Sequence, residues 1–289
     1  MPKIKYKDIV IREKGLAKIK QVNAIIDEYQ AQGYSLSLRQ VYYQLVSKNI
    51  IENSEKEYKN LGNLINDGRL VGLIDWNAIE DRTRNLRKNS HWGSPADIIR
   101  AAAESYHINL WETQPYYLEC WIEKDALIGI AEQAARIEYD VSCFSCRGYG
   151  SSTELWNAAR RIIGNNAKGK PAVILHLGDH DPSGIDMTRD IEARLSLFGA
   201  DVEIKRIALN MLQIEEHKPP PNPAKITDTR ADKYISQYGR NSWELDALEP
   251  RILDELIKSH ISNYLDINEF EQARSKQERE REQLLKLCV

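Results

Sequence analysis

The stretch AVILHLGDHDPSG, residues 172–184, decides the fold that we predict for this chain. Its first half is apolar at every position except His176, which is typical of a strand buried on both faces of a sheet. Its second half suits the start of a helix, because Asp181 can cap free backbone N–H groups and Pro182 fits the first helical position. A buried strand that leads directly into a helix predicts a parallel sheet covered by helices.

The same order recurs on both sides of this stretch. Residues 116–122, 139–145 and 201–209 also have the composition of strands, and helical segments follow the first two. We therefore predict an α/β domain over residues 111–289, with a mostly parallel sheet and helices on both faces. In such sheets, ligands bind beyond the carboxyl ends of the strands, so the candidate site should lie there.

Residues 1–110 have a different pattern. Apolar residues at helical spacing predict three helices, over residues 11–32, 38–48 and 54–68. Ser37 followed by Gln40 has the spacing of a capping box at the start of the second helix. Residues 70–85 offer short β-like pieces around a turn. Three helices and a hairpin are the order of a winged helix, a small α+β domain that inserts one helix into DNA. A helical domain without that function is the alternative.

The composition is that of an ordinary globular protein. Hydrophobic residues make up 42% of the 289 residues and charged residues 29%, which is enough apolar material for a core in each of two domains. No apolar run approaches the roughly 20 residues that span a bilayer, and the charged N-terminus contains no apolar signal segment. We therefore expect a cytoplasmic location and no membrane partner. The four cysteines are too few for a disulfide framework in a chain of this length.

Charge is distributed unevenly along the chain. Residues 1–100 carry 17 Lys and Arg against 12 Asp and Glu, whereas the remaining residues carry 23 against 31. A basic first part suits a polyanion such as double-stranded DNA, and an acidic second part suits cations. The candidate DNA-binding residues are cations of the first part, namely Arg39, Arg69, Arg82, Arg84, Arg87 and Lys88.

Charged side chains follow two of the predicted strands directly. Glu123 and Lys124 come after residues 116–122, and Asp179 and Asp181 come after the central strand. The two aspartates are two residues apart, so in an extended chain they point to one side. With Glu123 they form a ligand set for Mg²⁺, with Mn²⁺ as a possible substitute, because Mg²⁺ needs few protein carboxylates and keeps several waters. The alternatives are a helix N-cap for Asp181 and a surface charge for Glu123.

Two adjacent tyrosines, Tyr42 and Tyr43, lie in the second predicted helix. Adjacent helical residues point about 100° apart, so one apolar stripe cannot include both. The stripe consists of Leu38, Val41, Tyr42 and Leu45. We therefore predict that Tyr42 packs in the core and that Tyr43 is exposed beside Arg39, as a stacking residue, a surface residue or a nucleophile. A phenol has a pKa of about 10 and attacks phosphorus only if a cation stabilises its phenolate, which Arg39 or a divalent metal could do.

Taken together, these residues resemble one family. The sequence LRQVYY at residues 38–43, a Glu at a strand end and the sequence DHDPSG resemble the A subunit of topoisomerase VI and its meiotic double-strand-break relatives. That family joins a winged-helix domain with a catalytic tyrosine to a Toprim domain that holds Mg²⁺. By position, Tyr43 matches the family's nucleophile, and Glu123, Asp179 and Asp181 match its metal ligands.

Other parts of the chain extend the resemblance or depart from it. The sequence WELDAL, residues 243–248, resembles a later family motif and places Glu244 and Asp246 near the site. Gln40 follows Arg39 here, where the family usually has Asp after Arg. The chain is also shorter than a full A subunit and lacks the segment that docks an ATPase partner. It therefore resembles the compact stand-alone type sometimes called mini-A, and no nucleoside-triphosphate motif is visible.

The resemblance also implies a mechanism and partners. DNA is expected to lie across a homodimer, and Tyr43 to attack a backbone phosphorus and become joined to the 5′ end. Arg39, or Arg147 in the loop after residues 139–145, is expected to add a cationic contact. In the family, each tyrosine works with the metal site of the other subunit.

Two other functions are compatible with the same residues. A Toprim nuclease cleaves DNA with a metal-bound water and has no use for Tyr43. A non-catalytic DNA-binding protein needs neither the metal site nor Tyr43. Cleavage by the variants Tyr43→Phe and Asp179→Ala, compared with the wild-type protein, separates these possibilities.

Overall fold

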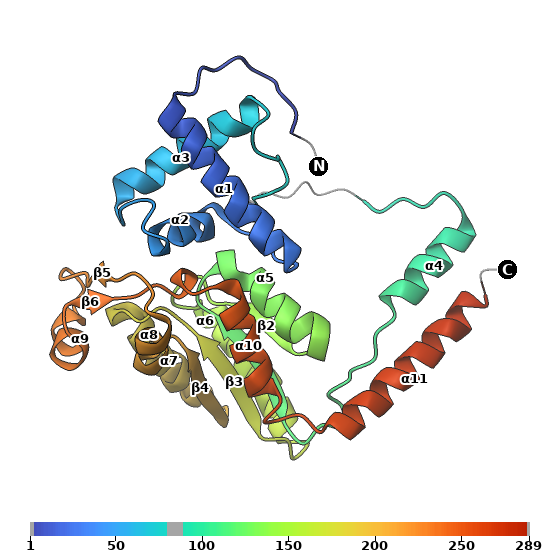
Figure 1. Ribbon diagram of the computed structural model, residues 1–289. Coiled ribbons are helices and arrows are strands. Elements are labelled where there is room, and N and C mark those ends of the chain that lie inside the picture. Colours follow the sequence, from blue (N-terminus) through green and yellow to red (C-terminus); the bar gives the residue numbers. More distant parts are fainter. Residues whose placement is uncertain (1–2, 80–88, 288–289) are drawn as a thin grey trace.

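The computed structural model describes residues 3–79 and 89–287 of the chain. A small helical unit, formed by the first part of the chain, sits on a larger unit built around a sheet (Figure 1). Two helices that are far apart in sequence, α4 (Pro95–Ser105) and α11 (Ile267–Leu285), project from the larger unit side by side.

The helical unit consists of α1 (Glu13–Ala31), α2 (Leu38–Ser47) and α3 (Glu55–Leu70), as the sequence pattern predicts. The capping box of α2 is confirmed, because the Ser37 side chain accepts a hydrogen bond from the Gln40 N–H while the Gln40 side chain accepts one from the Ser37 N–H. The three helices share one core, to which each contributes buried residues such as Ile25, Val41 and Leu61.

The predicted hairpin after α3 is only partly covered by the described residues. In the covered part, residues 71–79 form turns and two isolated β-bridges, of Lys5 with Val71 and of Leu36 with Ile79. Neither bridge belongs to a hairpin strand within the described residues, and positions 80–85 fall outside them. The three helices are therefore confirmed, whereas the wing of a winged helix is not.

The larger unit contains the predicted parallel sheet. Its strands lie in the order β2 (Ser142–Ser145), β1 (Tyr117–Ile122), β3 (Ala172–Leu177) and β4 (Val202–Ala208), and all three pairings are parallel. Because every strand runs the same way, all four carboxyl ends lie at one edge of the sheet. The residues that follow β1 and β3 are thereby brought together.

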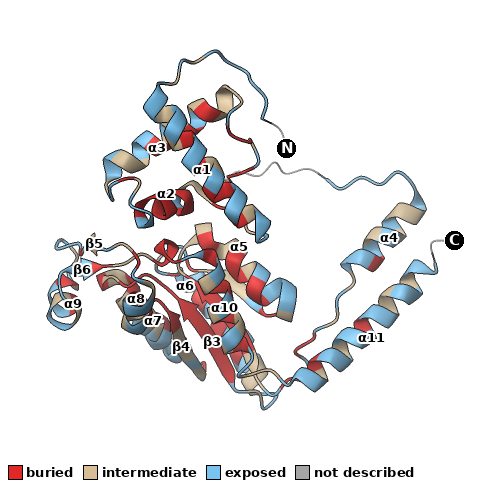
Figure 2. Cartoon of the chain, viewed as in Figure 1, coloured by how far each residue is buried: buried red, intermediate tan, exposed pale blue. Residues whose placement is uncertain are grey.

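Helices cover both faces of this sheet, which explains why β3 is apolar at every position except His176. In β3, Val173 and Leu175 belong to the core that contains α5 (Ile128–Ala131) and α10 (Pro250–Ile261). Alternate residues of the strand belong to the core on the other face, with α6 (Ser152–Asn166) and α7 (Pro182–Leu197). Figure 2 shows the result, with β3 and α2 mostly buried and α4 and α11 mostly exposed.

A compact insertion lies between β4 and α10. It contains α8 (Met211–His217), α9 (Ala231–Tyr238) and a short antiparallel pair formed by β5 (Asn222–Pro223) and β6 (Asn241–Ser242). The backbone of Trp243 exchanges hydrogen bonds with that of His180, which fixes the insertion to the loop after β3. After β6 the chain forms only a 3₁₀ turn at Leu245–Ala247 before α10 begins at Pro250.

The projecting helices α4 and α11 are joined by polar contacts. The Tyr106 hydroxyl donates a hydrogen bond to Glu280 over 2.7 Å, and the Arg281 side chain donates one to the Tyr106 carbonyl over 2.9 Å. The buried side chain of Gln277 accepts a hydrogen bond from the Ile108 N–H over 2.9 Å. Across the described ranges, none of the helices has the length and apolar character needed to cross a membrane.

Candidate functional site

A pocket of about 880 Å³ lies between the helical unit and the carboxyl edge of the sheet. Side chains from both units line it, including Arg39, Tyr43, Lys124, Asp179, Asp181 and Glu244. The structure therefore brings the predicted tyrosine and two predicted metal ligands of one chain into the same cavity.

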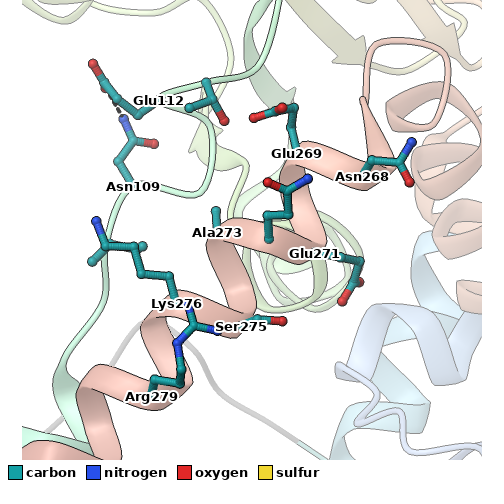
Figure 3. Close-up of a pocket in the computed structure, with 12 residues that line it drawn as sticks. Asn109, Glu112, Asn268, Glu269, Glu271, Ala273, Ser275, Lys276 and Arg279 are labelled. Carbon is teal, nitrogen blue, oxygen red and sulfur yellow. Dashed lines mark hydrogen bonds between the residues drawn. The ribbon is translucent and has the colours of Figure 1, made fainter.

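A second pocket of about 880 Å³ lies between α11 and residues 108–113 (Figure 3). Its labelled side chains are mostly polar, and one pair of them is linked by a hydrogen bond from Asn109 to Glu112 over 2.9 Å. Because the two pockets have the same volume, size does not distinguish them. The first pocket is the better candidate, since it alone of the two is lined by residues at strand carboxyl ends.

Glu123 enters the site directly after β1. Its backbone N–H donates a hydrogen bond to the Leu177 carbonyl over 2.8 Å, which holds it beside the end of β3. Its carboxylate accepts a hydrogen bond from the Asp179 N–H over 2.8 Å. Two glycines make room for it, because a Cβ at Gly178 or Gly184 would lie 2.9 or 3.1 Å from Glu123 Oε2. Burial raises the pKa of Glu123, and the nearby Asp181 raises it further.

Asp179 and Asp181 follow β3 but have different partners. Asp179 accepts a hydrogen bond from the Leu245 N–H over 2.7 Å and contacts Lys124 Nζ at 3.0 Å. Burial raises the pKa of Asp179 to about 7, against the opposing effect of Lys124. Asp181 caps α7, with its Oδ1 accepting a hydrogen bond from the Gly184 N–H over 2.6 Å. The alternative role of Asp181 as a helix N-cap is therefore confirmed, and the capping hydrogen bond is made by Oδ1.

Lys124 is the centre of a network of charges. Its ammonium lies 2.8 Å from Glu244, 3.0 Å from Asp246 and 3.0 Å from Asp179. Burial would lower the pKa of Lys124, but these three carboxylates raise it overall. Burial would likewise raise the pKa of Glu244, but Lys124 and then Arg39 lower it to about 2. These pKa shifts favour the charged forms of both Lys124 and Glu244.

Arg39 links the helical unit to this network. Its Nη2 donates to Glu244 over 2.5 Å, and its Nε lies 3.1 Å from Asp246, whose side chain is fully buried. The sequence WELDAL therefore supplies two carboxylates to the site, where the resemblance placed them. Burial raises the pKa of Asp246, against the effects of Lys124 and Arg39.

Tyr43 is buried, so the prediction that it is exposed is wrong. Its side chain is only 3% exposed, compared with 4% for Tyr42. Its hydroxyl accepts a hydrogen bond from Asn222 over 3.3 Å, and Arg39 lies 6.0 Å from its ring centre. Helical phase identifies the face of α2 that packs in its own core, but the opposite face is covered by the insertion and by Ala247 of the larger unit. Burial raises the pKa of Tyr43, and Glu244 raises it further.

Two of the other predicted cationic residues, Arg147 and Arg69, do not line the pocket. The Arg147 side chain is 72% exposed and pairs with Asp125 at 3.1 Å, on a loop outside the pocket lining. Arg69 is half-buried and donates to the backbone carbonyls of Trp76 and Ile79 over 3.2 and 2.8 Å. Its contacts are therefore those of a residue that holds the segment after α3. The remaining candidates, Arg82, Arg84, Arg87 and Lys88, lie outside the described residues.

Two residues that the sequence did not single out shape the site. The half-buried guanidinium of Arg206 donates hydrogen bonds to the carbonyls of Gly178, Asp179 and Gly184 over 2.8, 2.6 and 3.0 Å, and so holds the loop after β3. The position of Arg206, a cation within the strand-like stretch at residues 201–209, is the feature of the sequence that could have indicated this role. Asn222 lies in the proline-rich loop at residues 217–225, and no sequence pattern indicates its contact with Tyr43.

Comparison of the chain with protein-family models, with curated proteins and with solved structures gave no match. Within the described residues, no three His, Cys, Asp or Glu side chains converge as ligands around one point. Glu123 follows β1, and Asp179 and Asp181 follow β3, the neighbouring strand of the sheet.

Proposed function

We propose that this chain cleaves DNA by Mg²⁺-dependent transesterification, in the manner of the A subunit of topoisomerase VI. One observation carries the proposal: a single pocket is lined by Tyr43 from the helical unit and by Asp179 and Asp181 from the sheet edge. A nucleophile beside carboxylates that can hold a hard cation is the combination that phosphoryl transfer requires. Arg39 and Lys124 add fixed positive charge to the same pocket.

The reaction conserves a phosphodiester bond. The Tyr43 oxygen attacks a backbone phosphorus, the oxygen–phosphorus bond forms, and the bond from phosphorus to the 3′ oxygen breaks. Tyr43 becomes joined to the 5′ phosphate, its proton passes to a base or to water, and the 3′ oxygen takes up a proton to leave as a hydroxyl. Cleavage therefore needs neither ATP nor a redox partner, and any separate ATPase partner lies outside this step.

Groups of the chain act on the phenolate of Tyr43 in opposite directions, and their net effect raises the pKa of the phenol. Burial raises the pKa of this phenol, which opposes ionisation. The hydrogen bond that Asn222 donates and the charge of Arg39 act in the other direction, because both stabilise a negative oxygen. Arg39 is thus proposed as a catalytic cation, whereas the exposed Arg147 has no proposed part in the chemistry.

The carboxylates fit a divalent cation by their chemistry. Burial raises the pKa values of Glu123 and Asp179, and each carboxylate has a second acidic group nearby, so added positive charge is favourable there. Because residues 178 and 184 are glycines, the loop after β3 can pack directly against the Glu123 carboxylate. We propose that Glu123, Asp179 and Asp181 hold Mg²⁺, or Mn²⁺ in its place. When bound, the cation neutralises charge on the reacting phosphate.

We further propose that the helical unit is a winged helix that binds double-stranded DNA. Support comes from its three helices and from the basic composition of residues 80–88, whose structure lies outside the described ranges. Lys59 and Lys225 also line the pocket and suit a phosphate backbone. Cutting both strands needs two nucleophiles, so we propose a homodimer. We also propose a cytoplasmic location, which is consistent with DNA as the substrate.

The test is a trapping assay. Plasmid DNA is incubated with the protein and Mg²⁺ or Mn²⁺, the mixture is denatured rapidly, and protein attached to 5′ ends is measured. The proposal predicts attachment by the wild-type protein and none by Tyr43→Phe or Asp179→Ala. Binding without cleavage under either cation would instead indicate a non-catalytic DNA-binding protein.

A metal-dependent nuclease is the second candidate, because of one observation. Tyr43 is only 3% exposed, whereas a water molecule is small enough to reach the carboxylates without uncovering it. This candidate predicts that cleavage survives Tyr43→Phe, is lost in Asp179→Ala, and leaves free 5′ or 3′ phosphates instead of protein-linked ends.

A further inference from the structure

We infer that Arg206 is a positioning residue of the proposed metal site, which fixes the loop that carries Asp179 and Asp181 without pairing with either carboxylate. The inference rests on the proposed function, and it adds a residue to which neither the sequence motifs nor the family resemblance assigns a role. Its expected effect is on the affinity of the site for a divalent cation, because this loop supplies two of the three proposed ligands.

The position of Arg206 in β4 directs its side chain towards the loop. Arg206 is paired with His176 in the parallel register of β4 with β3. Because alternate side chains of a strand point to the same face, Arg206 shares a face with Val202 and Ile204, which pack against the core that contains α6 and α7. Arg206 is the last residue of β4 on this face, so its side chain leaves the apolar core where the loop begins.

The guanidinium of Arg206 makes five hydrogen bonds, as many as it has N–H donors. The acceptors are the carbonyls of Gly178 (2.8 Å), Asp179 (2.6 Å), Gly184 (3.0 Å) and Leu209 (3.3 Å) and the hydroxyl of Thr188 (3.0 Å). Three of these carbonyls belong to the two ends of the segment 178–184, which carries both aspartates. Hydrogen bonds from a charged donor are stronger than neutral ones, so one side chain fixes both ends of the segment.

Arg206 uses none of the carboxylate oxygens of the site. All five of its hydrogen bonds go to carbonyls or a hydroxyl, whereas Lys124 contacts the Asp179 carboxylate directly at 3.0 Å. Its charge is nevertheless close to Glu123, because Arg206 Nη1 and Glu123 Oε2 lie 3.2 and 2.9 Å from the position that a Cβ on Gly178 would occupy. The positive charge therefore reduces the repulsion between the carboxylates and leaves their oxygens available to a cation.

Thr188 and His176 hold the guanidinium in one orientation. The Thr188 hydroxyl oxygen accepts a hydrogen bond from Arg206 and lies 2.9 Å from Nδ1 of His176, which is fully buried. Burial, and then the charge of Arg206, lowers the pKa of His176 to about 3, so its ring is neutral. The hydroxyl proton is then free for Nδ1, because the hydroxyl oxygen already receives a proton from Arg206. A polar chain that begins in the core thus ends at the loop.

The test compares Arg206→Lys with a matched control, Arg194→Lys. Lysine keeps the positive charge but loses the fork of donors that reaches several carbonyls at once. Arg194 is half-buried like Arg206 and also ties α7 to a loop, through a hydrogen bond to the Gly150 carbonyl over 2.8 Å. That loop carries no proposed metal ligand. A general loss of stability therefore affects both variants, whereas a change at the metal site is expected only in Arg206→Lys.

The first measurement is the affinity for Mn²⁺ in the absence of DNA. Metal-free protein is titrated with Mn²⁺, and the free ion is followed by electron paramagnetic resonance spectroscopy. We expect Arg206→Lys to bind Mn²⁺ about tenfold more weakly than the wild-type protein, which is the loss expected from one charge-assisted hydrogen bond. Arg194→Lys should bind as the wild-type protein does. An unchanged Mn²⁺ affinity in folded Arg206→Lys would overturn the inference.

The second measurement needs no metal and separates the inference from the proposed function. Hydrogen exchange of the metal-free protein is followed by mass spectrometry in the segment 178–184, where the Gly178 and His180 N–H groups donate to the carbonyls of Ala208 and Trp243. Exchange in this segment should be about tenfold faster in Arg206→Lys than in the wild-type protein. It should be unchanged in Arg194→Lys.

If the wild-type protein binds no Mn²⁺, the proposed function fails, and the exchange rate alone decides whether Arg206 holds the loop. Equal exchange in Arg206→Lys and in the wild-type protein would show that it does not. If Arg206→Lys does not fold, Thr188→Val takes its place in both measurements, because it removes one of the five acceptors and keeps the arginine. Its changes should be smaller and in the same direction, and the absence of both changes would overturn the inference.

Discussion

Replacing Lys124 with Met should destabilise the protein more than removing any ordinary surface lysine. Met keeps most of the apolar stem but removes the ammonium that contacts Asp179, Glu244 and Asp246 at 2.8 to 3.0 Å. The Lys124 side chain is 19% exposed and that of Asp246 is fully buried, so solvent compensates little of the loss. Removing one partner of a buried ion pair costs about 3–5 kcal/mol. We expect about 3 kcal/mol, at the lower end, because Arg39 remains beside two of the three carboxylates.

The assay is thermal and urea unfolding of the wild-type protein and of two variants. A loss of about 3 kcal/mol corresponds to a fall in Tm of roughly 6–12 °C for a chain of this size. The matched control is Lys59→Met, which removes a lysine that is 70% exposed and, among the residues that the structure describes, forms an ion pair only with Glu55 four residues earlier in α3. That variant should lose less than about 0.5 kcal/mol. Equal effects of the two substitutions would refute the role of Lys124 as the centre of a buried network.

Three further predictions address other parts of the molecule. Glu119→Gln should lower the free energy of unfolding by about 1–3 kcal/mol, because buried Glu119 accepts charge-assisted hydrogen bonds from Arg161 at 2.9 and 3.1 Å. A change below about 0.5 kcal/mol in urea unfolding would contradict this prediction. Gly184→Ala should lower Tm and abolish DNA attachment, because the added Cβ would lie 2.3 Å from the Asp179 carbonyl oxygen. The control is Gly164→Ala, whose Cβ would meet open space in α6 and should raise the free energy of unfolding by up to about 1 kcal/mol. Equal Tm changes would count against the first effect. Chelation of divalent cations should abolish DNA attachment and added Mn²⁺ should restore it, and attachment that persists after chelation excludes the proposed metal role.

Local sequence patterns predicted most of the fold. Ser37 and Gln40 encode a capping box within four residues, and the apolar run at residues 172–177 encodes a strand buried on both faces. Both signals depend only on neighbours in sequence, so they can be recognised without knowing the rest of the structure. The position of Glu123 and Asp179 at one edge follows from the same information, since parallel strands align their carboxyl ends.

The contacts between the two units could not be predicted in that way. Helical phase placed Tyr42 correctly, but it could not show that residues near 222 and 247 cover the opposite face of α2 and bury Tyr43. Such docking depends on residues about 180 positions away in the chain, as the contact between Tyr43 and Asn222 shows with its separation of 179. The direction of the Arg147 side chain could not be predicted from the sequence either. Its backbone has a φ of 50°, and its side chain pairs with Asp125 outside the pocket.

The most direct test of the central claim is to identify the atom that becomes attached to DNA. Adducts formed with Mg²⁺ are denatured, digested with a nuclease and a protease, and analysed by mass spectrometry. The proposal predicts that Tyr43 carries a nucleotide through its 5′ phosphate and that Tyr42, its equally buried neighbour, does not. Cleaved DNA with free phosphate ends and an unmodified Tyr43 would contradict the proposal.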